Sequence, residues 1–290
     1  MDKKDITKQI EELELLHLLT SAYAEISSGR MKKTRDGVLT SRQFIEELSA
    51  IFREIRASYQ AQFEALAKKK GFKKGEKITF LSHNGKKVAV FLSANTGFYG
   101  SLTRQVFDLF MEDVKKDNLE ATVVGKLGLA LFRERSPNTA YSYFDLPDSK
   151  SDTEKLGLLV RHLVQYDSIQ IYYGKFKSII NQIPDKISIS AVTEISGEKA
   201  VEKTKYIFEP TLEDILMFFE TEMFSYTFEQ TISESQLAKF ASRMIAMDQA
   251  GEKIRGSLDV LKLDNLRVTH GIQNRKQLEY LSSILNSGRI

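Results

Sequence analysis

Residues 234–263, ESQLAKFASRMIAMDQAGEKIRGSLDVLKL, decide the fold of this chain. Their large apolar residues recur every three or four positions, the spacing that places side chains on one face of an α-helix: Leu237, Phe240, Met244, Met247, Ile254, Leu258 and Leu261. No proline interrupts residues 211–290, and a proline inside a helix costs about 3 kcal/mol. Thr211 precedes two acidic residues, which is typical of a helix start. We therefore predict a long helix over residues 211–290.

The N-terminal region carries the same spacing in two stretches. The apolar residues are Ile6, Ile10, Leu13, Leu16, Leu19, Tyr23 and Ile26 in residues 2–28, and Phe44, Leu48, Ile51, Ile55, Tyr59 and Leu66 in residues 41–67. So narrow a stripe is typical of a helix that packs on one partner helix. Residues 29–40 form either a loose turn or a continuation of the helix, because Gly37 costs only about 1 kcal/mol relative to Ala.

Between these regions the hydrophobic period changes to that of strands alternating with helices, which is typical of a small α/β domain. The predicted strands are residues 77–82, 86–95, 121–133, 168–176, 187–195 and 204–210. The predicted helices are residues 99–117 and 152–166. The Ser-His-Asn-Gly sequence between the first two strands indicates a hairpin.

The predicted fold class is α/β, with a central Rossmann-like domain flanked by two long terminal helices. We place an N-terminal coiled-coil region at 1–67, the globular α/β domain at 76–210 and a C-terminal coiled-coil helix at 211–290. A helix of about 60 residues is about 90 Å long, far beyond the width of a small domain, so the domain cannot bury the whole apolar stripe and another element must pack on it. We predict that the two terminal helices cover each other as an antiparallel coiled coil.

The composition excludes several kinds of site. The 290 residues include no Cys, which rules out disulfides, thiol catalysis and Cys-based zinc sites. The four His lie at least 66 residues apart, so no local metal motif is present. No phosphate-binding loop occurs, and the glycines at 97, 100, 125 and 128 fit tight turns better than a ligand site at strand ends. No apolar window is long enough to predict a membrane span. We predict no catalytic residue, cofactor or metal.

Charge is unevenly distributed along the chain. The formal net charge is only +3, but residues 1–87 hold 18 Lys and Arg against 12 Asp and Glu. The basic clusters are Arg30, Lys32, Lys33 and Arg35, and then Lys68, Lys69, Lys70, Lys73 and Lys74. A solvated helix surface explains them, and so does a contact surface for an acidic partner. One alternative therefore remains open, a stand-alone coiled-coil protein that binds nucleic acid or an acidic partner through this basic third, although interleaved aromatics are absent.

Six stretches in sequence order resemble the gamma subunit family of F-type ATP synthases. They are LLTSAYAEISSGRMKK (18–33), SANTGFYGSL (93–102), VVGKLGLALFR (123–133), IYYGKFKSIINQIP (171–184), YIFEP (206–210) and ESQLAKFASRMIAMDQA (234–250). The last is the most specific, through Arg243, Met244, Ala246, Met247 and Asp248. The chain departs from the family where Asn95 and Tyr99 stand for its usual acidic residue and Cys, and where Thr269 and His270 stand for an Arg-Gln pair.

The resemblance implies a central rotor shaft that turns inside a ring of three alpha and three beta subunits. The α/β domain would lie near the epsilon subunit and the membrane c-ring, on the cytoplasmic face of the cell membrane. Ion flow would turn the ring and shaft, while nucleotide and catalytic residues would belong to alpha and beta. The implied contacts with the alpha–beta head are Arg30, Met31, Lys32, Lys33, Arg243, Met247, Asp248 and Arg267. By spacing alone, the methionines fit the coiled-coil core better.

Overall fold

The computed structural model describes residues 2–58, 84–148, 152–189, 209 and 211–287. Two compact units are present, residues 1–28 with 243–290 and residues 29–242. The described elements, in chain order, are α1 (Lys3–Ser58), β1 (Lys87–Leu92), α3 (Leu102–Asp117), β2 (Glu120–Val124), α4 (Lys126–Arg135), β3 (Tyr141–Phe144), α5 (Thr153–Val164), β4 (Ser168–Phe176), β5 (Gln182–Ile189) and α6 (Leu212–Ser287).

The two long helices are each continuous. Helix α1 has 56 residues and passes through 29–40 without a break, so this segment continues the helix rather than forming a turn. Helix α6 has 76 residues and begins where the sequence predicts. The hydroxyl of Thr211 accepts a hydrogen bond from the backbone N–H of Asp214 at 3.2 Å, the interaction of an N-cap residue.

Helices α1 and α6 pair in antiparallel fashion within each unit. In the unit of residues 29–242, the guanidinium of Arg42 lies 2.9 Å from the carboxylate of Glu234. Two ring contacts join the same helices, Phe44 with Tyr226 at 5.0 Å and Phe52 with Phe219 at 5.6 Å between centroids. In the other unit, Lys262 contacts Glu14 at 2.8 Å. Partner numbers fall on α6 as they rise on α1, which confirms the antiparallel coiled coil.

The α/β domain contains one five-stranded sheet in the order β3-β2-β1-β4-β5. All neighbouring strands are parallel except β5, which runs antiparallel to β4 at the edge. Pro184 lies in β5, and an edge strand tolerates a residue that has no backbone N–H. A mostly parallel sheet with helices on both faces confirms the predicted Rossmann-like α/β fold.

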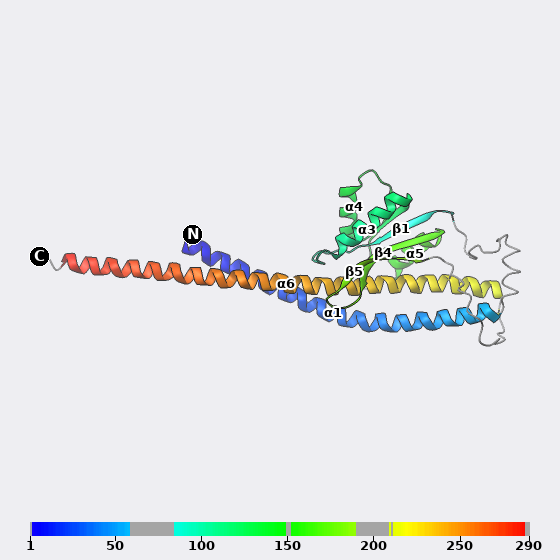
Figure 1. Cartoon of the computed structure of the whole chain (residues 1–290), viewed down its shortest axis with the longest axis horizontal. Helices are drawn as coiled ribbons and strands as arrows, with labels where there is room; N and C mark the ends of the chain where they lie inside the picture. Colours follow the sequence, from blue (N-terminus) through cyan, green and yellow to red (C-terminus); the bar gives the residue numbers. More distant parts are fainter. Residues whose placement is uncertain (1, 59–83, 149–151, 190–208, 210, 288–290) are drawn as a thin grey trace. The chain divides into compact units, whose positions relative to one another are not determined.

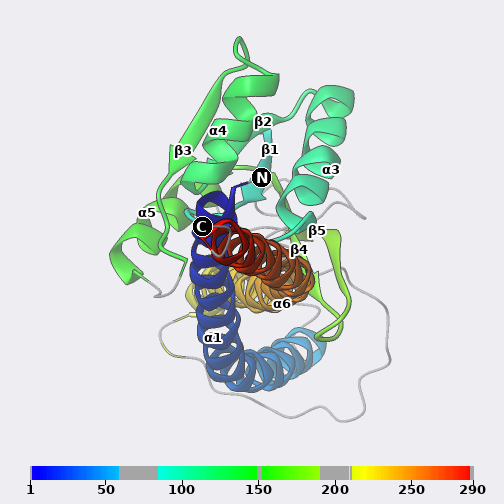
Figure 2. The same cartoon turned by 90° about the vertical axis from the view of Figure 1, so that its left-hand side faces the viewer.

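Each face of the sheet carries its own apolar cluster, because side chains alternate along a strand. On β1, Ala89 and Phe91 point to a cluster covered by α3 and α4, whereas Val88 and Val90 point to one covered by α5 and α6 (Figures 1 and 2). Helix α6 adds Phe228 to the second cluster, fully buried. Burying one such side chain stabilises the fold by about 1.5–3 kcal/mol.

Two predictions about the domain need correction, and one strand was missed. Residues 121–133 are not one strand: β2 ends at Val124, and the backbone turns at Gly125, with φ of 95°, into α4. The predicted hairpin between residues 77–82 and 86–95 is wrong, because β1 pairs with β2 along one edge and with β4 along the other, which leaves no edge for a hairpin partner. The short strand β3 was not predicted.

Of the remaining predicted helices and strands, three are present, one begins earlier than predicted, and others lie outside the described residues. The strand predicted over 168–176 is confirmed as β4, and the helices predicted over 99–117 and 152–166 are present as α3 and α5. The strand predicted to begin at 187 starts earlier, as β5. Residues 77–82, 190–195 and nearly all of 204–210 lie outside the described residues.

Candidate protein-binding surface

The unit formed by the two chain ends exposes much apolar surface. In α1, Leu15 is 59% exposed and Leu18 is 65% exposed. The other large apolar side chains left exposed among the described residues of this unit are Leu16, Leu19, Tyr23, Ile26, Val260, Leu263, Leu266, Ile272, Leu278, Tyr280 and Leu281. We call this set the apolar shaft surface. So many large apolar side chains left exposed on one pair of helices indicate a place where another protein binds.

The helix pairing explains why this surface stays open. Two paired helices bury only the seam between them, as at Ile6, which is 3% exposed. Consecutive helical residues point about 100° apart, so Leu15 and Leu16 cannot both enter one seam. The prediction that Leu16 and Leu19 lie on the face packed against the partner helix is wrong: they are 48% and 46% exposed, and the half-buried side chains at these turns are His17 and Thr20.

Ion pairs border the apolar shaft surface. Lys262 donates to Glu14 across the two helices, and this hydrogen bond raises the pKa of Lys262. Within α6, Arg267 pairs with Asp264 at 2.9 Å. Both pairs are solvent-exposed, so water and salt screen them and they contribute little to stability. His270, one of the positions that depart from the family, is exposed nearby on the same helix.

The basic residues predicted to contact a partner lie on α1. Arg30, Lys32 and Lys33 are exposed, and the Arg30 guanidinium lies 5.9 Å from the ring centroid of Phe240. Met31, in contrast, is 6% exposed. The structure thus presents three cations on one helical turn, while Met31 packs inside. The second basic cluster, residues 68–74, lies outside the described residues.

The other predicted contact residues lie on α6, in the unit of the two chain ends. Arg243 and Met247 are buried, at 6% and 8% exposure. Asp248 and Arg267 are exposed. Burial of Met247 supports its interpretation as coiled-coil core. A contact of these residues with a partner stays a prediction.

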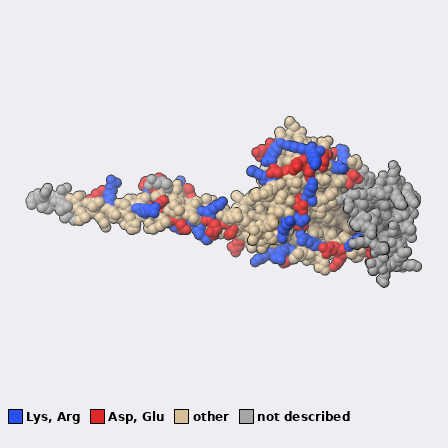
Figure 3. All heavy atoms as spheres, viewed as in Figure 1, with Lys and Arg blue, Asp and Glu red and all other residues tan. Residues whose placement is uncertain are grey.

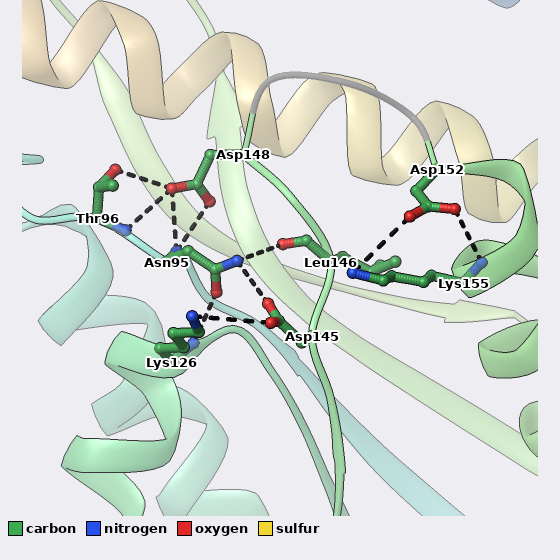
Figure 4. A network of polar contacts seen from close by, with 8 residues as sticks. All are labelled: Asn95, Thr96, Lys126, Asp145, Leu146, Asp148, Asp152 and Lys155. Carbon is green, nitrogen blue, oxygen red and sulfur yellow. Dashed lines mark hydrogen bonds and ion pairs between the residues drawn. The ribbon is translucent and has the colours of Figure 1, made fainter.

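At the carboxyl edge of the sheet, where α/β domains bind ligands, hydrogen bonds join the protein's own loops to one another (Figure 4). The Asp148 carboxylate accepts hydrogen bonds from the backbone N–H groups of Asn95 and Thr96 at 2.9 and 3.0 Å. The Asn95 amide donates to Asp145 at 2.6 Å. A Cβ on Gly125 would lie 2.8 Å from the Ala94 carbonyl oxygen. These contacts favour the turn interpretation of the glycines over a ligand site.

Titratable groups in the domain are engaged in structural pairs. A hydrogen bond from Lys86 lowers the pKa of Glu120, and burial together with a hydrogen bond to Glu120 raises the pKa of Tyr166 to about 12. Lys and Arg side chains are interspersed with Asp and Glu on the visible face of this domain (Figure 3). Among the described residues, no cluster of His, Asp and Glu is placed to hold a metal ion, and no helix has the length and apolarity to cross a membrane.

Comparisons with known proteins cover nearly the whole chain. A family model described as ATP synthase matches residues 2–268. The ATP synthase gamma chains of Ruthia magnifica subsp. Calyptogena magnifica and Pelotomaculum thermopropionicum are each 23% identical to this chain, over 270 and 268 residues, with 90% of both chains covered in each case.

Two solved structures share the fold. One is the central stalk/c-ring of the Tetrahymena thermophila mitochondrial ATP synthase, with 18% identity and a TM-score of 0.56, covering 80% of this chain and 99% of that chain. The other comes from the OSCP/F1/c-ring structure of the Euglena gracilis mitochondrial ATP synthase, with 13% identity and a TM-score of 0.52, covering 89% and 94%. At these identities the likeness concerns the fold.

Proposed function

Because the chain belongs to the ATP synthase gamma family, we infer that it is the rotor subunit of the central stalk of an F-type ATP synthase. One structural observation carries the mechanical part of this inference. Helices α1 and α6 pair in antiparallel fashion, and the chain between them folds into an α/β domain. Within the unit of residues 29–242, the paired helices offer a shaft and the α/β domain a body by which it can be turned.

The shaft would act by changing its orientation inside a ring of three alpha and three beta subunits. Paired helices resist bending better than a single helix, and sharp kinks arise mainly at proline, which α6 lacks throughout. A rigid shaft passes rotation to the ring instead of absorbing it. Each orientation would present a different side to each beta subunit and so change that subunit's affinity for nucleotide.

The apolar shaft surface is suited to contact the inner side of this ring while the shaft turns. Its exposed leucines offer non-directional contacts, which can slide and re-form as the shaft turns. The exposed cations Arg30, Lys32 and Lys33 suit acidic loops on beta, with about 1 kcal/mol or less for each exposed pair. Contacts of this strength favour reversible engagement with three partners in turn.

The remaining parts of the proposal concern the other subunits. ATP chemistry would take place on alpha and beta, and this chain would contribute no catalytic residue. The α/β domain would contact the epsilon subunit and the c-ring at the cytoplasmic face of the cell membrane. We also propose that the chain is organised in three parts: an N-terminal coiled-coil region (1–67), the α/β domain (76–210) and a C-terminal coiled-coil helix (211–290).

Family membership supports the rotor over the stand-alone binding protein that the basic N-terminal third leaves open. The two functions differ in a measurable way. A rotor is present once per complex, whereas a stand-alone protein does not need the alpha–beta head at all. Binding to nucleic acid would also weaken steeply with salt concentration.

Native mass spectrometry of the complex purified through a tag on this chain tests the proposal. We expect one copy of the chain with three alpha and three beta subunits. As a control, a tag on alpha should recover the same assembly. Recovery of this chain alone, from cells in which the tagged alpha recovers an intact head that lacks it, would contradict the rotor function.

A further inference from the structure

Helix α6 is joined to the loop after β1 by two short hydrogen bonds. The Lys239 ammonium donates to the Ser93 carbonyl oxygen at 2.6 Å, and the Ser242 hydroxyl donates to the Tyr99 carbonyl oxygen at 2.7 Å. Lys239 is only 8% exposed. The two donors are three positions apart and therefore lie on one side of the helix. We call these two bonds the α6 joint.

The loop that accepts these bonds is itself firmly held. The carboxylate of Asp148, in the segment after β3, accepts hydrogen bonds from the backbone N–H groups of Asn95 and Thr96 and, at 3.2 Å, from the hydroxyl of Tyr99. The Asn95 side chain also accepts a hydrogen bond from the backbone N–H of Lys126 at the start of α4 (Figure 4). The loop thus connects β1, α4 and the segment after β3, so a force on any of them reaches the α6 joint.

Apolar packing holds α6 against the domain with less angular specificity than hydrogen bonds add. Phe228 and Ala238 hold α6 to the domain, but apolar contacts are non-directional. Hydrogen bonds weaken steeply when their angle changes, and those from a charged donor are the stronger kind. Burying an ammonium group also costs free energy unless the group is hydrogen-bonded. If this position served packing alone, an apolar side chain would stabilise the fold more than Lys239 does.

We propose that Lys239 and Ser242 are positioning residues that fix α6 to the α/β domain, so that the domain and this part of the shaft turn together. The mechanical role rests on the proposed rotor function. The rigid attachment itself does not, because it is a property of the unit of residues 29–242. Their effect would reach the reaction through the angle at which α6 is held.

The first test measures the attachment in the full-length chain without partners. Because the chain has no native cysteine, nitroxide labels can be placed at Lys115→Cys on α3 and Glu229→Cys on α6, both exposed. Pulsed electron paramagnetic resonance then gives the distribution of distances between them. We expect a narrow distribution that broadens in the Lys239→Met, Ser242→Ala double variant. An unchanged distribution would overturn the proposal.

Two controls separate positioning from general stability. Lys253→Met with Ser257→Ala makes the same changes at exposed positions of α6, and should leave the distribution narrow. Ser242→Thr keeps a hydroxyl donor, so it should retain a narrower distribution than Ser242→Ala. Broadening in the exposed control pair, or equal broadening by Ser242→Thr and Ser242→Ala, would show that the two hydrogen bonds are not the cause.

The second test measures coupling in the assembled complex. The double variant should retain ATP hydrolysis but lose ATP-driven ion pumping, because the head would turn α6 without turning the domain fully. If the wild-type chain fails to assemble with alpha and beta, the proposed rotor function fails while the labelling result still stands. If the wild-type chain assembles and pumps, and the double variant pumps equally well, the positioning role fails.

Discussion

Replacing Phe228 by Ala tests how strongly α6 is anchored to the sheet. Phe228 is fully buried, and its ring stacks on Phe224 with centroids 6.1 Å apart and an interplanar angle of 4°. It packs in the same cluster as Val88, Val90 and Ile171, so the substitution leaves a cavity between α6 and the sheet. A Phe→Ala change in a core costs about 3–5 kcal/mol. We expect the free energy of unfolding to fall by that amount.

Urea denaturation of the full-length chain, followed by circular dichroism, measures this loss. With an m-value of about 3 kcal/mol per M, the midpoint should fall by about 1–2 M urea. Phe218→Ala is the matched control, because Phe218 lies on the same helix but is 62% exposed. It should change stability by less than about 1 kcal/mol. Equal losses in the two variants would refute the packing of α6 described here.

Four further substitutions have defined outcomes. Gly125→Ala should cost about 2 kcal/mol or more in urea denaturation, because its φ is 95° and its Cβ would meet backbone, whereas Gly37→Ala, in open space within α1, should stabilise by about 0.5–1 kcal/mol. Burial alone raises the pKa of Asp113, but hydrogen bonds to its carboxylate outweigh this and hold the pKa below 3.8. The ionised form therefore stabilises the fold above that pH, so Asp113→Asn should be less stable than wild type at pH 7, and the difference should shrink as pH falls below 3.8; a gap that widens in acid would contradict the pairing. Leu18→Gln, at a position 65% exposed, should leave unfolding nearly unchanged yet weaken binding to the alpha–beta head about fivefold or more in a titration; unaltered binding would exclude Leu18 from the interface.

The long helices and the sheet strand β4 could be predicted from the sequence because their patterns are long or unambiguous. Whether residues 29–40 form a turn or continue the helix could not be predicted, because the free-energy penalty for a glycine in a helix is small enough for packing on α6 to outweigh it. Helix α4 was missed because Leu127, Leu129 and Leu131 alternate as in a strand. Its helical packing shows only in Gly128 and Phe132, buried four positions apart.

The candidate surface was only partly predictable. Adjacent leucines, as at Leu15 and Leu16, already signal an apolar surface wider than one helix seam. Burial of Arg243 depends on what packs around it, which the spacing of apolar residues does not reveal. The α6 joint was not predictable, because Lys239 occupies an ordinary helical position, and its acceptor lies 146 residues away in the chain.

ATP-driven rotation of this chain within the head complex is the most direct test of the rotor function. A biotin attached at Lys115→Cys, on the exposed side of α3, can carry a bead while the head is fixed to a surface. We expect steady rotation in one direction that requires ATP and stops when ATP is removed. A bead that shows only random angular motion, on a complex that contains this chain and hydrolyses ATP, would contradict the rotor function.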